Sequence, residues 1–327
     1  MNHYLRNTLA AGLLMAAAAG QGAAAQQAAT SWTATQPIRI VVPFSAGGGS
    51  DVAARLVSAG MGNALGQPMV VENKPGASGA IASDIVYTAA PDGHTLLLGT
   101  ADTQAMNPHV NKVRFDALKY VPVGGIAKVP YVLVGRPDLP AANLAELLAL
   151  AKRTSLSYGS SGAGTGAHVQ MTMFAKAANV TDLLHVPYQG VAPAFQAVLA
   201  GQVDLSMVPV ALASQYPGKL RFYGLPSLDR NPALPDVPTL AEQGYRVDAD
   251  SWNGLLAPPG TPPEVAAAIA QKLLAVVSAP EAQKKLRELG MVPYTDPQAE
   301  FAEFYKKEYD KWGAAIQAAG LAPGQGQ

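Results

Sequence analysis

The 327-residue sequence contains no cysteine. This absence excludes disulfides, thiolate zinc sites, thiol nucleophiles and a lipid-modified cysteine anchor. Charged residues are scarce as well, at 14% of the chain, and Lys plus Arg equals Asp plus Glu at 23 each. A neutral chain without a basic tract lacks the positive field that nucleic-acid binding needs, so we expect no nucleic-acid partner.

Long apolar runs are also absent, except in the first 25 residues, which have the pattern of a secretory signal peptide. Arg6 precedes a run of small and apolar residues from Thr8 to Gly20, and Ala23 and Ala25 are the small residues that a signal peptidase requires. The run is shorter than the roughly 20 residues of a membrane span. The sequence therefore predicts cleavage near Ala25 and a soluble protein exported to the periplasm; an ordinary N-terminal helix is the alternative.

The rest of the chain alternates between short apolar strands and amphipathic helices. This alternation predicts an α/β fold with parallel sheets covered by helices. Strands are expected at 37–43, 69–71, 95–100, 131–134, 156–158, 203–207 and 220–223, and helices at 52–65, 81–89, 143–153, 167–178, 262–279 and 297–319.

The order strand, glycine loop, helix occurs twice, about 115 residues apart, with loops at 45–51 and 159–166. The first loop fails as a dinucleotide fingerprint because Val52 stands where the third small residue should be, although Glu72 lies where a ribose-binding acid would. It fails as a P-loop because no lysine follows. Two interpretations remain: a backbone cradle for an anion, and a tight turn with Ser50 or Asp51 as the helix cap.

Catalytic patterns are missing. Both Gly-x-Ser-x-x segments, at 76–80 and 159–163, lack the final glycine of a nucleophile elbow. The five histidines show no metal-ligand spacing, and for His168 packing is at least as good an explanation as ligand contact. We therefore expect no catalytic residue, metal or cofactor.

Seven motifs, in order over about 220 residues, resemble those of one family: VPFSAGGGSD at 42–51, VENKPGASG at 71–79, APDGHTL at 90–96, YGSSGAGT at 158–165, HVPYQG at 185–190, LPDVPTLAE at 234–242 and APPGTP at 257–262. The sequence is similar to the solute-binding receptors of tripartite tricarboxylate transporters, the Bug-type periplasmic binding proteins. Ala197 and Asn253 depart from the family pattern, which leaves the ligand open.

The resemblance implies a two-lobed, type II Venus-flytrap α/β fold, each lobe a mixed, mostly parallel sheet flanked by helices. Lobe 1 would comprise residues 36–134 and 251–327, lobe 2 residues 135–250, with hinge strands near 132–134 and 255–257. The function implied is capture of a small organic carboxylate by a monomer and its delivery to the membrane subunits of such a transporter; an exported α/β enzyme acting on a small carboxylate is the alternative. The expected ligand-binding residues are Phe44, Ala46, Gly47, Gly48, Ser50, Asp51, Thr100, Asp102, Ser160, Ser161, Gly162, Gly164, Thr165, His168, Tyr188, Gln189 and Gly190.

The two loops contain no lysine or arginine. A bound anion would therefore rely on backbone N–H groups, helix N-termini and the hydroxyls of Ser160, Ser161 and Thr165. Asp51 and Asp102 alone could pair an ammonium group there. We therefore expect a carboxylate without an amino group, and a second carboxylate, one per lobe, is left open.

Overall fold

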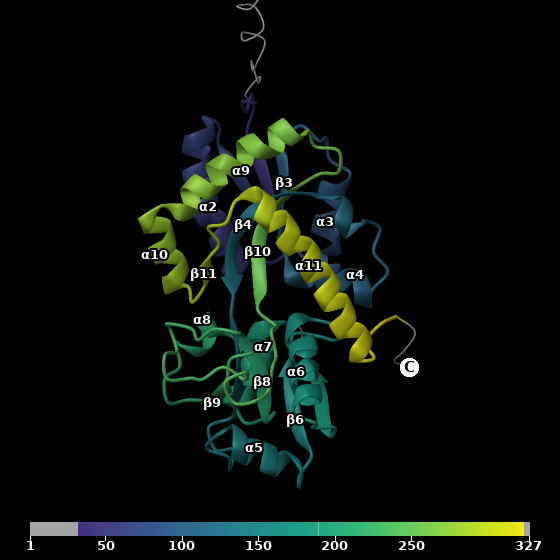
Figure 1. Ribbon diagram of the computed structural model, residues 1–327, viewed down its shortest axis with the longest axis vertical. Helices are drawn as coiled ribbons and strands as arrows, with labels where there is room; N and C mark the ends of the chain where they lie inside the picture. Colours follow the sequence, from purple (N-terminus) through teal and green to yellow (C-terminus); the bar gives the residue numbers. More distant parts are fainter. Residues whose placement is uncertain (1–31, 189, 324–327) are drawn as a thin grey trace, which may run out of the picture. The chain divides into compact units, whose positions relative to one another are not determined.

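The computed structural model describes residues 32–188 and 190–323 (Figure 1). The chain divides into a unit at Met1–Trp32 and a unit at Thr33–Gln327, and both sheets belong to the second. The expected signal peptide and Gln189 lie outside the described residues.

The first sheet has the strand order β11-β4-β10-β3-β1-β2. Strand β1 is parallel to β2 and β3, whereas β10 runs antiparallel to β3 and β4, and β11 runs antiparallel to β4. Its strands are β1 (Ile38–Val42), β2 (Met69–Asn73), β3 (Thr95–Thr100), β4 (Val121–Val129), β10 (Ser251–Ala257) and β11 (Val292–Pro293).

The second sheet has the order β7-β6-β8-β5-β9. Strand β6 is parallel to β7 and β8, and β5 is antiparallel to β8 and β9. Its strands are β5 (Tyr131–Gly135), β6 (Leu156–Ser160), β7 (Leu183–Pro187), β8 (Leu205–Pro209) and β9 (Arg221–Gly224). Both sheets are thus mixed. Strands β10 and β5 each run antiparallel to both of their neighbours, which makes the sheets less parallel than the sequence suggested.

Helices flank both sheets (Figure 1). They are α2 (Gly49–Leu65), α3 (Ala80–Tyr87), α4 (Asn107–Val110), α5 (Leu144–Ala151), α6 (Gly166–Ala177), α7 (Val191–Leu199), α8 (Val210–Ala213), α9 (Pro263–Ser278), α10 (Pro280–Glu288) and α11 (Gln298–Ala318), with short turns η1 (Ala77–Gly79), η2 (Ala101–Met106, a π-helix) and η3 (Ala117–Lys119). Among these described helices, none alone has the length and apolar composition of a membrane span; α9 and α10 pass that test only as a pair bent by 70°.

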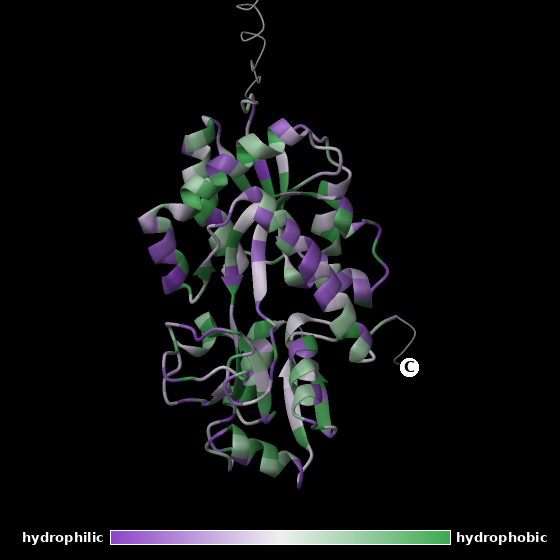
Figure 2. Ribbon diagram, in the orientation of Figure 1, coloured by the Kyte–Doolittle hydropathy of each residue, from purple (hydrophilic) through white to green (hydrophobic). Residues whose placement is uncertain are grey.

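Helix α11 shows why an amphipathic sequence folds in this place. Its buried side chains recur every three or four residues, which places them on one helical stripe. Phe301 and Tyr305 from this stripe pack around Trp252 of β10. Hydrophilic residues dominate the face of α11 that is visible in Figure 2. The stripe therefore covers one face of the first sheet.

The chain crosses from the first sheet to the second at Pro130 and returns at Asp250. The two crossings lie side by side, since Ser251 pairs with Val129. Pro130, between β4 and β5, has no N–H to donate to a neighbouring strand, so neither sheet's ladder continues through it. Strand β5 pairs with β8 and β9 and so belongs to the second sheet, whereas the expected boundary lies after Val134. The expected hinge segments, 132–134 and 255–257, lie inside β5 and β10, and the crossings are at 129–131 and 249–251.

Strand β4 was not among the strands expected from the sequence, and two glycines lie at its centre. The structure shows why they are needed. A Cβ on Gly124 would lie 2.9 Å from Leu273 of α9, and one on Gly125 would lie 2.4 Å from Tyr294. Close packing of these side chains on both faces of the strand requires glycine, so the two glycines are a consequence of tertiary packing.

Candidate functional site

Asp51 holds the first glycine loop in shape. It is 2% exposed, and its Oδ2 accepts hydrogen bonds from the Gly47 N–H (2.9 Å) and from Arg55 Nε (3.0 Å). Its Oδ1 accepts one from Asn73 Nδ2 at 2.9 Å, and the same Nδ2 also donates to the Phe44 carbonyl. The hydrogen bond from Arg55 contributes most to lowering the pKa of Asp51 to about 2. Asp51 is therefore an ionised structural residue, with both oxygens engaged by the protein.

Helix α2 begins at Gly49, and Gly48 is its N-cap, without any side-chain cap. The alternative of Ser50 or Asp51 as the cap is thus wrong. The first amides of a helix have no acceptor within it, and those of Gly49 and Ser50 donate to no other group in the described chain. The loop residues 45–49 are exposed. The loop can therefore present N–H groups and the positive end of a 17-residue helix to an anion.

Asn253 of β10 lies beneath this helix end. Ser50 Oγ donates to Asn253 Oδ1 at 3.2 Å. Asn253 is 2% exposed, and its Nδ2 is buried without a hydrogen-bond partner in the described part of the chain. From the sequence, Asn253 was noted only as a departure from a family pattern. The available signal was the alternation of polar Ser251 and Asn253 with apolar neighbours, which places both on one face of a strand.

The second glycine loop, by contrast, uses its polar groups internally. Ser160 Oγ accepts from the Gly162 N–H at 3.1 Å, and Thr165 Oγ1 donates to the Gly162 carbonyl at 2.7 Å. The Gly164 N–H donates to His168 Nδ1 at 2.9 Å. These bonds leave the loop with fewer donors for a ligand than the first loop has.

Three stacked aromatic rings pack next to the second loop. The rings of His168 and His185 stack with centroids 3.9 Å apart, and Tyr158 stacks on His185 at 4.9 Å. His185 Nε2 lies 2.7 Å from Ser160 Oγ. Burial, and secondarily the neighbouring His185, lowers the pKa of His168 to about 4, and burial lowers the pKa of His185. Both rings are therefore neutral near pH 7.

Asp102 connects the two sheets. It lies in η2, at the carboxyl end of β3, and its Oδ1 accepts from the N–H of Gly166, the first residue of α6, at 2.9 Å. Its Oδ2 accepts from Ser251 Oγ at 3.3 Å. A Cβ on Gly166 would lie 2.7 Å from Oδ1, so only glycine permits this approach. Burial raises the pKa of Asp102.

The other expected residues have mainly structural contacts. Thr100 is 2% exposed and caps η2 by accepting from the Thr103 N–H. The Tyr188 N–H donates to the Ser160 carbonyl, which brings the end of β7 beside the second loop. Gly190, with φ +121°, is the N-cap of α7. The remaining expected residues lie on the two glycine loops and are not assigned a role: Phe44, Ala46, Gly48, Ser161 and Gly162.

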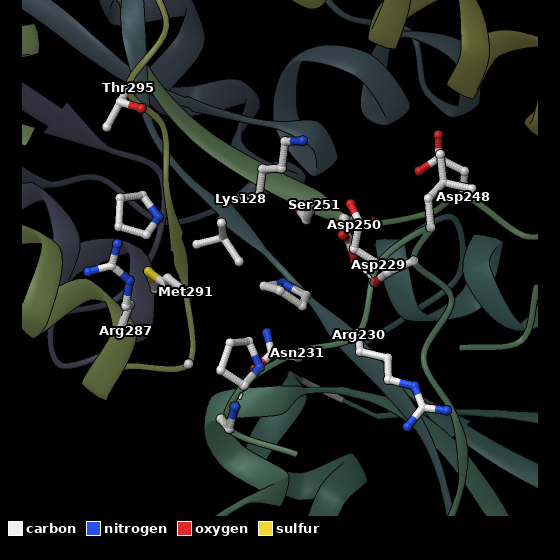
Figure 3. Close-up of a pocket in the computed structure, with 18 of the residues that line it drawn as sticks. Lys128, Asp229, Arg230, Asn231, Asp248, Asp250, Ser251, Arg287, Met291 and Thr295 are labelled. Atoms are coloured by element: carbon white, nitrogen blue, oxygen red, sulfur yellow. Dashed lines mark hydrogen bonds between the residues drawn. The ribbon is translucent and has the colours of Figure 1, made fainter. Parts of the chain in front are cut away.

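A cavity of about 480 Å³ lies elsewhere, beside the crossings (Figure 3). None of the expected ligand-binding residues lines it. The strand orders place it on the opposite flank of the crossing strands, because its wall includes β11 and the segment after β9, whereas the glycine loops follow β1 and β6. In Figure 3, Lys128 lies between Arg287 on one side and Asp250 on the other. Burial raises the pKa of Asp250 to about 6.

Comparison with known proteins places the chain in one family. Residues 53–321 match the family described as "Tripartite tricarboxylate transporter family receptor". A UPF0065 protein of Bordetella pertussis is 35% identical, over 88% of this chain and 91% of its own.

Two solved structures are similar as well. Rpa4515 of R. palustris with adipate is 30% identical, with a TM-score of 0.80 over 88% of this chain and 98% of its own. MatC (Rpa3494) from Rhodopseudomonas palustris with bound malate is 30% identical, with a TM-score of 0.76 over 86% and 99%. The expected two-lobed periplasmic binding protein fold is thereby confirmed. The chain belongs to the receptor family of the tripartite tricarboxylate transporters.

Proposed function

We propose that this protein is a periplasmic solute-binding protein that captures a small organic carboxylate between its lobes and delivers it to the membrane subunits of a tripartite tricarboxylate transporter. The relatives solved with adipate and malate support the ligand class. The observation that carries the proposal is the first glycine loop, where Asp51 fixes the backbone and the amides of Gly49 and Ser50 face no acceptor.

In this proposal the ligand carboxylate binds at the N-terminus of α2. A partly buried anion at a helix N-terminus gains up to about 2 kcal/mol. Each charge-assisted hydrogen bond adds about 1.5–3 kcal/mol. Two or three such bonds, together with the contribution of the helix N-terminus, provide roughly 8 kcal/mol, the binding free energy of a micromolar ligand. A lysine or arginine is therefore not needed. The hydroxyls of Ser161 and Tyr188 would complete the site from the second lobe, since that of Thr165 already donates to the Gly162 carbonyl.

We further propose that lobe 1 comprises residues 36–130 and 251–327, lobe 2 comprises residues 131–250, and the protein acts as a monomer. The crossings at 129–131 and 249–251 would then act as the hinge. A ligand that contacts both lobes shifts the population toward the closed arrangement, because only that arrangement offers all of its contacts.

The alternative function, an enzyme, would need a nucleophile and a base. Ser160 Oγ and His185 Nε2, which lie 2.7 Å apart, resemble such a pair. Ser160 is fully buried, and its hydroxyl is also within 3.0 Å of the Gly162 carbonyl. In the described chain no acidic side chain bonds to His185, so the third member of a catalytic triad is missing. The pair serves the loop's shape, and we propose no catalytic activity.

The test is a thermal-shift screen of the mature protein against aliphatic and aromatic carboxylates, followed by calorimetry. A ligand at 100 times its dissociation constant adds about 2.7 kcal/mol, a shift of several degrees for a chain of this size. Absence of a shift with every carboxylate, together with a shift for a cationic or neutral solute, would contradict the ligand class. Sequencing the N-terminus of periplasmic material tests export, with Gln26 expected as the first residue.

A further inference from the structure

The N-terminus of α6 already holds a carboxylate, and it belongs to the protein. Asp102 Oδ1 lies 2.9 Å from the Gly166 nitrogen, where an anionic ligand of this helix would otherwise bind. The two helices that follow the glycine loops are therefore not equivalent. Helix α2 offers amides without an acceptor, and α6 has its first amide engaged.

In the described part of the chain, no cation balances the charge of Asp102. The groups that face it are the Gly166 N–H from α6, the Ser251 hydroxyl from β10 and the phenol of Tyr131 from β5. Burial raises its pKa, whereas its two hydrogen bonds and the N-terminus of α6 favour the ionised form, and no lysine or arginine contributes. A second negative charge placed here would meet Asp102 without compensation, which is costly in a partly buried site.

Strand β10 links Asp102 to the first loop. Ser251 contacts Asp102 and Asn253 contacts Ser50, and these two β10 residues lie on the same face, two positions apart. At about 3.4 Å per residue they are separated by about 7 Å. The buried, unpartnered Nδ2 of Asn253 lies on this face and is an independent sign that a ligand atom belongs there. A small acid bound at α2 would therefore have its other end near Asp102.

We propose that Asp102 selects the class of carboxylate: the ligand has one carboxylate, at the N-terminus of α2, and at its other end a hydrogen-bond donor such as a hydroxyl rather than a second carboxylate. This inference rests on the proposed function. Each oxygen of Asp102 accepts one bond from the protein and keeps a further lone pair for a ligand donor. A dicarboxylate with one carboxylate per lobe is then disfavoured, in contrast to the adipate and malate of the two solved relatives.

The experiment compares matched pairs of equal chain length by calorimetry at pH 7.5: succinate with 4-hydroxybutanoate, glutarate with 5-hydroxypentanoate, and adipate with 6-hydroxyhexanoate. In the best-binding pair we expect the hydroxy acid to bind at least tenfold more tightly than the diacid. Asp102→Asn keeps the shape and can still bond to Gly166 and Ser251, and it should reduce this preference at least fivefold. Asp182→Asn, at an exposed carboxylate outside the site, should keep the wild-type preference.

Circular dichroism establishes that each variant is folded, and Asp102→Ser replaces Asp102→Asn if the latter is not. A wild-type protein that binds the diacid as tightly as the hydroxy acid overturns the inference, as does a preference that survives in a folded Asp102 variant. If the wild-type protein binds no carboxylate of any kind, the proposed function fails and the inference fails with it.

Discussion

The imidazole rings of His168 and His185 lie face to face, with planes only 8° apart. Two stacked imidazoles tolerate each other only while at least one is neutral, because a second positive charge at this distance is repelled and poorly hydrated. His168 is 8% exposed, and its Nδ1 accepts a hydrogen bond from the second glycine loop, which a protonated Nδ1 could not do. The shape of that loop is thus linked to the protonation of one side chain.

The first prediction concerns acid stability. The pKa of His168 is lowered to about 4 from its ordinary value of 6.5. The unfolded state therefore binds more protons below pH 6.5, so stability falls as the pH falls and levels off below about 4. At about 1.4 kcal/mol per pH unit, the loss is about 3 kcal/mol. The free energy of unfolding, measured with urea from pH 7 to pH 4, should fall less in His168→Gln than in the wild type. An equal fall in the two proteins would contradict this, and His94→Gln is the matched control.

The second prediction concerns the scaffold of the first loop. Asp51→Ala removes the acceptor of three hydrogen bonds and leaves Arg55 and Asn73 without their shared partner. We expect a loss of about 2 kcal/mol in the free energy of unfolding and at least tenfold weaker ligand binding. Lys307→Ala, which breaks an exposed ion pair with Glu303, should change either quantity little. Normal binding by a folded Asp51→Ala protein would show that the network does not shape the site.

The third prediction separates the two glycine loops. Gly48 has φ −75°, and a Cβ there would lie 3.6 Å from its nearest neighbour, so Gly48→Ala, Val and Leu should fold normally. Binding should weaken progressively along the series, because the side chain covers the N-terminus of α2. At Gly164, with φ +74°, a Cβ would lie 2.5 Å from Val110, so the same changes there should lower the melting temperature as well. Calorimetry combined with thermal melts distinguishes the two cases; weak binding with a lowered melting temperature at Gly48 would contradict the assignment.

The fourth prediction concerns the cavity beside the crossings, which Ala233 helps to line. If the lobes rotate about the crossings, moving them apart on the side of the glycine loops should bring them closer on the side of the cavity and narrow it. Ala233→Phe fills part of the cavity and should disfavour the open arrangement, raising ligand affinity severalfold. Small-angle scattering should then show a smaller radius of gyration without ligand than in the wild type. The exposed substitution Ala142→Phe is the control, and equal behaviour of the two variants would contradict the hinge.

Much of the fold could be predicted from local patterns. The strand, glycine loop and helix at 38–65 and at 156–177 follow from apolar strands, glycine and helical periodicity, which are properties of adjacent residues. The strand β4 and the position of β5 could not be predicted in this way. Gly124 and Gly125 are explained only by the side chains of distant Leu273 and Tyr294, and β5 joins the second sheet by pairing with β8, far along the chain.

The candidate site, too, could be predicted only in part from the sequence. Composition and spacing are enough to establish that two helix N-termini carry glycine loops without lysine or arginine. The three-dimensional packing was needed to show that Asp51 is bound within its own loop, that Asn253 lies under α2 and that Asp102 occupies the end of α6. Hydrogen bonds between residues 64 to 203 positions apart depend on how the two sheets and their crossings are placed, and no local pattern encodes that placement.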